Sequence, residues 1–260
     1  MKYLLTVIML LFAAFTSFGQ KTDTVLIQKQ NLELKHLKTG NSTYLVYFKK
    51  SATGPAQNIT LVKINVESTV VNGKKAFAVT QQWDSMEEQM HTAYTVHDAA
   101  DFSMIKHDTW WKRQGYTAKY DFTTKQVTFD GKIEDAAKEK IISDFNDSFA
   151  SYNLCWHSDL LIFPLFPFKE GRTLQVNFYD PGFGKPKIAE YKVAGSEFLT
   201  SSSGEKIDCW ILEYKSAMPS GATAVQRFWI SKKSREVLKE EDQFGAGFRY
   251  KFKIGVSGEK

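Results

Sequence analysis

The sequence has 260 residues, of which 43% are hydrophobic and 14% aromatic, and its formal net charge is +5. The charged residues are spread along the chain without a basic block, so electrostatics give no argument for a nucleic-acid partner. The aromatic residues, 20 of them phenylalanine, instead indicate a large core, a lined cavity, or both.

The first residues have the pattern of an export signal. Lys2 supplies a positive charge, a largely apolar stretch runs from Leu4 to Phe15, and Ser17-Phe18-Gly19 offers small residues near a cleavage site. We predict a signal peptide over residues 1–19 and a mature chain, starting at Gln20, that is periplasmic or secreted. A membrane anchor is the alternative, but the apolar stretch is shorter than a transmembrane helix needs.

Most segments from about Leu32 onward alternate between apolar and polar residues with period two, which is typical of strands with one dry and one wet face. The clearest runs are residues 62–67, 77–83, 116–123, 174–178 and 248–254. Turn signals such as Asn72-Gly73 and Asp130-Gly131 separate the runs at short intervals and favour antiparallel hairpins in chain order. The sequence predicts a single mainly β domain over residues 20–260.

The histidines and tryptophans between residues 91 and 111 allow more than one interpretation. His91 and His97 lie on one face of a strand, and His107 fits the next strand. A metal site built from His91, His97 and a carboxylate is possible, but no standard zinc spacing is present. We therefore favour solvent-facing strand histidines and predict no metal ligands. Trp110 and Trp111 point to opposite faces, so one belongs to the core and the other meets solvent, a ligand or a covering loop.

One segment follows a helical period instead. Apolar residues recur at spacings of three and four, as expected for an amphipathic helix of roughly five turns. These residues are Ile133, Ala137, Ile141, Phe145, Phe149, Tyr152 and Trp156. We expect Phe145 and Phe149 to face the concave side of the sheet and Asp144 to lie on the polar face.

A markedly apolar segment follows the helix. Seven of the nine residues from Leu160 to Phe168 are large and apolar, and only Pro164 and Pro167 interrupt them. The prolines favour an extended loop at the rim or floor of the sheet's hollow. Since consecutive side chains of an extended segment cannot all point inward, we expect Phe166 or Phe168 to be reachable from solvent. A completely buried plug is the alternative.

Residues between the helix and this loop invite a catalytic interpretation. Cys155 and His157 offer a nucleophile and a base, but residues so close in sequence rarely meet in catalytic geometry. We predict no catalytic residues, no cofactor and no enzyme activity. Cys155 and Cys209 can pair in an exported protein, or Cys209 can be a small buried residue of a strand, and sequence alone leaves both open.

Three local patterns support a family resemblance. They are Asp159-Leu160-Leu161 followed by Lys169-Glu170-Gly171-Arg172, then 191–197 leading to Trp210-Ile211-Leu212, and Phe228-Trp229-Ile230-Ser231 followed by 234–239. Over about 133–252 the chain resembles an uncharacterised family of exported bacterial β-proteins, a domain of unknown function. That family is similar to the periplasmic carriers and acceptors of outer-membrane lipoproteins. The resemblance implies a single curved antiparallel sheet, a half-open β-barrel, with the amphipathic helix and the apolar loop packed in or over its concave face.

In the lipoprotein carriers the hollow holds acyl chains. The resemblance therefore implies a cell-envelope protein that binds an apolar or amphipathic ligand, a lipid or an acylated protein. The alternative is a non-enzymatic scaffold of envelope assembly with a filled core and an envelope protein as partner, and peripheral membrane contact is compatible with either. The residues we expect to line the ligand are Phe145, Phe149, Trp156, Phe163, Leu165, Phe166 and Phe168.

Overall fold

The computed structural model describes residues 23–218 and 221–255. The predicted signal peptide lies outside these residues. Within the described part, no helix is both long and apolar enough to span a bilayer.

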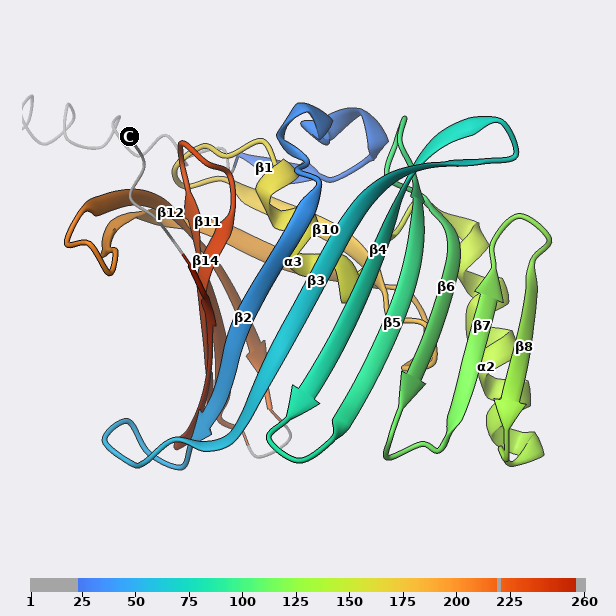
Figure 1. Cartoon of the computed structure of the whole chain (residues 1–260). Helices are drawn as coiled ribbons and strands as arrows, with labels where there is room; N and C mark the ends of the chain where they lie inside the picture. The colour runs from blue at the N-terminus through green and yellow to red at the C-terminus, as the bar shows by residue number, and fades with distance from the viewer. Residues whose placement is uncertain (1–22, 219–220, 256–260) are drawn as a thin grey trace, which may run out of the picture.

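The described strands form one large curved sheet (Figure 1). The fifteen strands are β1 (Thr24–Leu26), β2 (Gly40–Lys49), β3 (Gln57–Val71), β4 (Lys74–Ser85), β5 (Gln89–Asp98), β6 (Met104–Trp111), β7 (Tyr116–Asp121), β8 (Gln126–Gly131), β9 (Leu154–Cys155), β10 (Thr173–Tyr179), β11 (Lys187–Thr200), β12 (Lys206–Ala217), β13 (Thr223–Ser231), β14 (Val237–Phe244) and β15 (Gly247–Lys253). Neighbours pair antiparallel, except that β1 and β9 run parallel to β10.

The order of the strands explains the shape. At one edge of the sheet β1 lies beside β10, and the strands then follow in order from β10 to β15. Strand β2 lies beside β15, the order continues to β8, and the sheet does not close. From β10 to β15 and from β2 to β8 the strands follow chain order through hairpins, as the turn signals predict, and the two runs join where β15 pairs with β2. The predicted half-open barrel is therefore confirmed.

The period-two patterns mostly have the expected faces. In β3, Val62, Ile64 and Val66 are buried while Lys63 is exposed. β15 is the exception, because Lys251 is its buried residue.

The rings of β15 lie on the opposite face of the sheet. Phe248, Tyr250 and Phe252 are half-buried there, and the Tyr250 ring stacks on Tyr47 with centroids 5.2 Å apart. The apolar residues of the 248–254 run thus do not form the dry face. Period two defines two faces but does not say which of them is inside.

The predicted helix forms but is shorter than five turns. Helix α2 spans Asp135–Asp147, and the 3₁₀ turn η4 (Ser148–Ala150) follows. Side chains satisfy backbone carbonyls at its end, since Ser148 Oγ donates to Phe145 O at 2.6 Å and Asn153 Nδ2 donates to Ser148 O at 2.6 Å. Phe145 is buried as expected, but Asp144 is buried as well, which corrects its placement on an exposed face.

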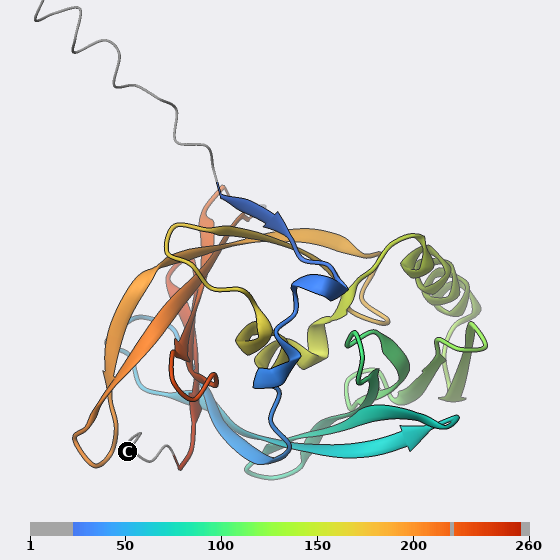
Figure 2. The ribbon, with the colours of Figure 1, turned by 90° about the horizontal axis from the view of Figure 1, so that it is seen from above.

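The apolar segment lies inside the curved sheet (Figure 2). Residues 159–166, here called the inner segment, form helix α3 (Asp159–Ile162) and the 3₁₀ turn η6 (Phe163–Leu165). The expected extended conformation is therefore wrong up to Leu165. Pro164 fits because it lies in the first turn of η6, where the backbone N–H that it lacks needs no partner within that turn.

Two further 3₁₀ turns cross one end of the hollow, over the inner segment. These are η2 (Lys29–Asn31) and η3 (Leu34–His36), which lie between β1 and β2 in sequence (Figure 2). The Glu33 N–H donates to Leu165 O at 2.8 Å and so ties this stretch to the inner segment.

Candidate functional site

The interior of the half-barrel is the first candidate, and its apolar part is filled. Phe163, Leu165 and Phe166 of the inner segment each have 0% of their surface exposed. The Phe163 ring packs against Phe228 and Tyr191, with centroids 4.6 and 5.0 Å away. The inner segment therefore occupies the concave face as a plug.

The structure separates the predicted ligand-lining residues into two groups. Phe163, Leu165 and Phe166 belong to the main core cluster, and Trp156 and Phe168 pack against that cluster. Phe145 and Phe149 belong to a second cluster between α2 and strands β6 and β7.

Solvent access differs between the two rings at the end of the loop. Phe166 is fully buried, whereas Phe168 is half-buried, stacked on Trp210 at 6.0 Å and capped by the Arg235 guanidinium at 5.2 Å. Of the two rings expected to be reachable from solvent, only that of Phe168 is partly exposed.

A group of buried charges on the inner face of β14 and β15 was not predicted from the sequence. Glu240, Asp242 and Lys251 are at most 3% exposed. Arg249 Nη2 lies 2.7 Å from Glu240 Oε1 and 2.5 Å from Asp242 Oδ2, and Lys251 Nζ lies 2.5 Å from Glu240 Oε2. Burial and the nearby Glu240 carboxylate raise the pKa of Asp242 to about 7. The signal was present in the alternation of Glu240 and Asp242 with Arg249 and Lys251 opposite, but such patterns usually mark a solvated face.

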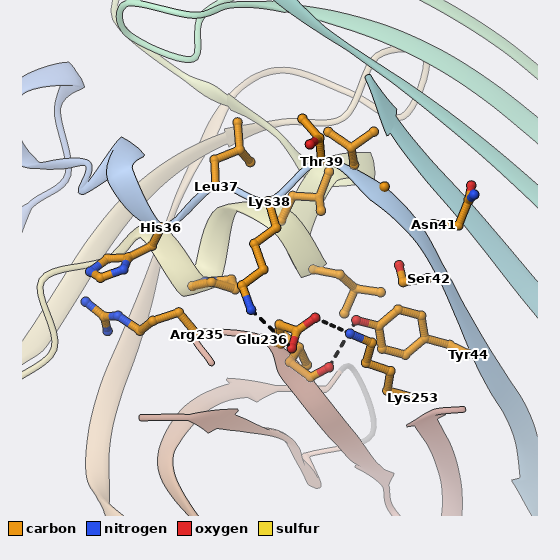
Figure 3. Close-up of a pocket in the computed structure, with 16 residues that line it drawn as sticks. His36, Leu37, Lys38, Thr39, Asn41, Ser42, Tyr44, Arg235, Glu236 and Lys253 are labelled. Atoms are coloured by element: carbon orange, nitrogen blue, oxygen red, sulfur yellow. Dashed lines mark hydrogen bonds and ion pairs between the residues drawn. The ribbon is translucent and has the colours of Figure 1, made fainter. Parts of the chain in front are cut away.

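A pocket of about 100 Å³ opens at the end of the hollow beside the inner segment (Figure 3). Leu160, Leu161 and Pro164 supply an apolar wall, and Leu37 and Val237 extend it. Its charged residues come from the stretch after η3 and from the ends of β14 and β15.

These charges do not balance. Lys38 Nζ lies 3.5 Å from Glu236 Oε2, Lys253 pairs with the same carboxylate, and Arg235 pairs with Glu33. Three cations thus share two carboxylates. Burial and the charge of Arg235 lower the pKa of His36, which keeps this ring neutral near pH 7. An apolar wall beside an excess of positive charge suits an amphipathic anion.

The histidines are not where the sequence placed them. His91, His97 and His107 are all 0% exposed, so the expectation of solvent-facing rings is wrong. His97 is held between Phe102 O and Ser158 Oγ, at 3.2 and 2.9 Å.

The structure also decides between the alternatives left open for the tryptophans and for the cysteines. Trp110 and Trp111 are both half-buried, and Trp111 stacks on His91 with centroids 3.7 Å apart. Cys155 and Cys209 are both buried and no disulfide joins them.

Three solved structures resemble the chain at low similarity. A β-barrel-like protein of domain of unknown function DUF1849 from Brucella abortus has 8% identity and a TM-score of 0.36, over 85% of this chain and 99% of its own. Lipoprotein LppX from Mycobacterium tuberculosis has 8% identity and a TM-score of 0.27, over 89% and 95%. A putative outer membrane lipoprotein-sorting protein domain from Vibrio parahaemolyticus has 10% identity and a TM-score of 0.23, over 88% and 94%.

Comparison with curated proteins gave no match. A family model described as "Protein of unknown function (DUF3108)" matches residues 43–253, from β2 to the end of β15. This match confirms the expectation of an uncharacterised β-protein family. Because the model covers most of the chain, the protein belongs to the DUF3108 family.

Proposed function

We propose that the protein is a non-enzymatic binding protein of the cell envelope, and that its ligand is an amphipathic molecule with an apolar chain and an anionic group. A lipid or an acylated protein has this chemistry. The observation that carries the proposal is the pocket beside the inner segment, with its apolar wall of Leu160, Leu161 and Pro164. The signal peptide expected over residues 1–19 supports the location.

The two parts of the pocket suit the two parts of such a ligand. Apolar surface that the chain buries against the inner segment contributes about 25 cal/mol per Å², before the cost of ordering the ligand. The positive excess of Lys38, Arg235 and Lys253 over Glu33 and Glu236 attracts the anionic group.

The test is a titration with a fluorescent fatty-acid probe. We expect saturable binding that unlabelled fatty acid displaces. Leu161→Asp places a charge on the apolar wall and should weaken binding at least about tenfold, which corresponds to about 1.4 kcal/mol. Ile59→Asp is the matched control, because Ile59 is 40% exposed near the start of β3, away from the pocket, and this variant should bind like the wild type.

A second pair of measurements separates the anionic group from the chain. Lys38, whose side chain is 53% exposed, should contribute to binding of the fatty acid and not to binding of the corresponding fatty alcohol. The proposal is contradicted if Lys38→Ala weakens the binding of both probes equally, or if the wild type binds neither probe.

One observation favours a second function, a filled-core interaction protein of envelope assembly. Phe163, Leu165 and Phe166 are fully buried, so these three side chains offer no open apolar floor within the described part of the concave face. The absence of probe binding in the wild type, together with recovery of a partner by crosslinking in the envelope, would support this function instead.

A further inference from the structure

A second group of polar side chains lies between the sheet and the residues just before the inner segment. His91 comes from β5, His107 from β6 and Cys155 from β9, and His157 lies in the 3₁₀ turn η5 (Trp156–Ser158). One ligand atom each of His107, Cys155 and His157 lies within 4.8 Å of the other two. The pocket and the plug do not use these residues.

The three imidazole rings share one arrangement, in which Nδ1 has a partner and Nε2 is left over. His91 Nδ1 lies 2.7 Å from Trp110 O, and His107 Nδ1 lies 2.8 Å from Thr95 Oγ1. His157 Nδ1 forms an ion-pair contact with Asp180 Oδ1 at 2.9 Å.

Each Nε2 atom is buried and has no hydrogen-bond partner among residues 23–218 and 221–255. Metal-binding histidines characteristically hold one ring nitrogen with a carboxylate, carbonyl or hydroxyl and present the other to the ion. Three buried nitrogens of this kind in one cluster are costly for a protein that leaves them unpaired.

The spacing of the His107 and His157 rings fits one ion. Their centroids lie 4.9 Å apart. For two imidazoles bound to one tetrahedral ion at the usual metal–nitrogen distance, the centroids are roughly 5 Å apart. Cys155 Sγ lies 4.0 Å from His107 Nδ1, and its sulfur lies within 4.8 Å of a ring nitrogen of both His107 and His157.

We propose that His107, Cys155 and His157 form a buried site for a divalent transition-metal ion, Zn²⁺ foremost. Imidazole and thiolate are the donors that Zn²⁺ prefers. Binding releases the Cys155 thiol proton and any proton on His157 to solvent. The ion would fasten β9 and η5 to β6 directly before the inner segment, and this inference does not depend on the proposed function.

Cobalt substitution tests the site on the full chain. The protein is stripped with a chelator and titrated with CoCl₂, and the absorbance is followed. We expect one equivalent to bind with a thiolate-to-cobalt charge-transfer band and the intense visible bands of tetrahedral cobalt, and ZnCl₂ to displace it. MgCl₂ and CaCl₂ should not, because these ions prefer oxygen ligands. No thiolate band at one equivalent overturns the proposal.

Variants locate the site. Cys155→Ser should abolish the charge-transfer band and weaken Zn²⁺ binding at least about 100-fold, the upper end of what losing an outer-shell partner costs. Cys209→Ser is the matched control, since Cys209 is equally buried but lies in β12, and it should retain both signals. Equal affinities in the two variants would overturn the assignment.

A milder variant covers the case in which Cys155→Ser does not fold. Asp180→Asn keeps the shape of a half-buried side chain and removes the charge that faces His157 Nδ1. We expect Zn²⁺ affinity to fall about 10- to 100-fold with the cobalt bands retained. Unchanged affinity in this variant would contradict the role of Asp180 as the residue that positions His157.

Discussion

Phe145 shows what a single residue contributes to the packing of α2. Its ring is fully buried and lies 5.0 Å from the rings of both Phe122 and Phe149. Phe145→Ala should lower the free energy of unfolding by about 3–5 kcal/mol, the range for a large aromatic removed from a core. Urea unfolding measures this. The control is Ile142→Ala, at a residue on the same helix that is 40% exposed, and it should cost less than about 1 kcal/mol. Equal losses at both positions would contradict the packing of Phe145 between α2 and the sheet.

The histidines show why residue-level predictions failed. In β5, His91, Ala93, Thr95 and His97 all point inward, while Met90 and Tyr94 are exposed. The sequence showed correctly that His91 and His97 share a face, but a face of histidine, alanine and threonine looks more polar than its opposite. Only the neighbouring strands and the residues of η5 decide that this face is covered.

His97 gives a pH dependence at the same scale. Burial lowers its pKa to about 4 in the folded state, while the unfolded chain titrates near 6.5. The folded protein thus binds fewer protons between these values, so the contribution of His97 is complete above pH 6.5 and is lost as the pH falls through 4. A shift of this size corresponds to about 3 kcal/mol.

Denaturant unfolding between pH 7 and pH 4 should therefore show a shallower loss of stability in His97→Gln than in the wild type. Buried His91 and His107 titrate in the same direction, so a slope remains in the variant. Parallel curves for the two proteins would contradict the assignment of His97.

At the scale of elements, β14 and β15 carry the buried charges into the hollow. In Lys251→Met, the buried carboxylates of Glu240 and Asp242 keep Arg249 as their cation in the cluster but lose Lys251. The free energy of unfolding should fall by about 3–5 kcal/mol, the typical cost when a buried ion pair loses one partner. Denaturant unfolding measures the loss. Lys119→Met, at an exposed residue of β7, should change stability by less than about 0.5 kcal/mol.

Adding Glu240→Leu to Lys251→Met removes both charges and should recover part of the loss, because an apolar pair of similar volume needs no counterion. A double variant that is less stable than the sum of its two single changes would mean that the pair does not act as a unit.

Helices and strands could be predicted where a local sequence pattern determines them. The hairpins and the core face of α2 follow from period and turn residues. Near the early end of α2, Asn153 donates back to Ser148 O, a contact that the helical period does not predict. The helical inner segment was misjudged because Pro164 argues against a helix interior, whereas its place in the first turn of η6 imposes no penalty.

For the whole molecule, the sequence predicts a curved antiparallel sheet but not how its halves meet. The junction of β15 with β2 and the crossing of η2 and η3 over the hollow are contacts between distant parts of the chain. The pocket has the same origin, since its residues come from the η3–β2 stretch, the inner segment and the ends of β14 and β15. No stretch of sequence contains enough of it to be recognised.

The presence of a ligand in the native protein can be measured directly. Native mass spectrometry of the protein, purified without detergent from cells that make it, should show one molecule of an amphipathic lipid or acyl compound bound to part of the population. Leu161→Asp should shift this population to the mass of the chain alone, and Ile59→Asp should not. A wild type found only at the mass of its own chain, and still so after incubation with lipid vesicles, would contradict a ligand-binding function for the half-barrel.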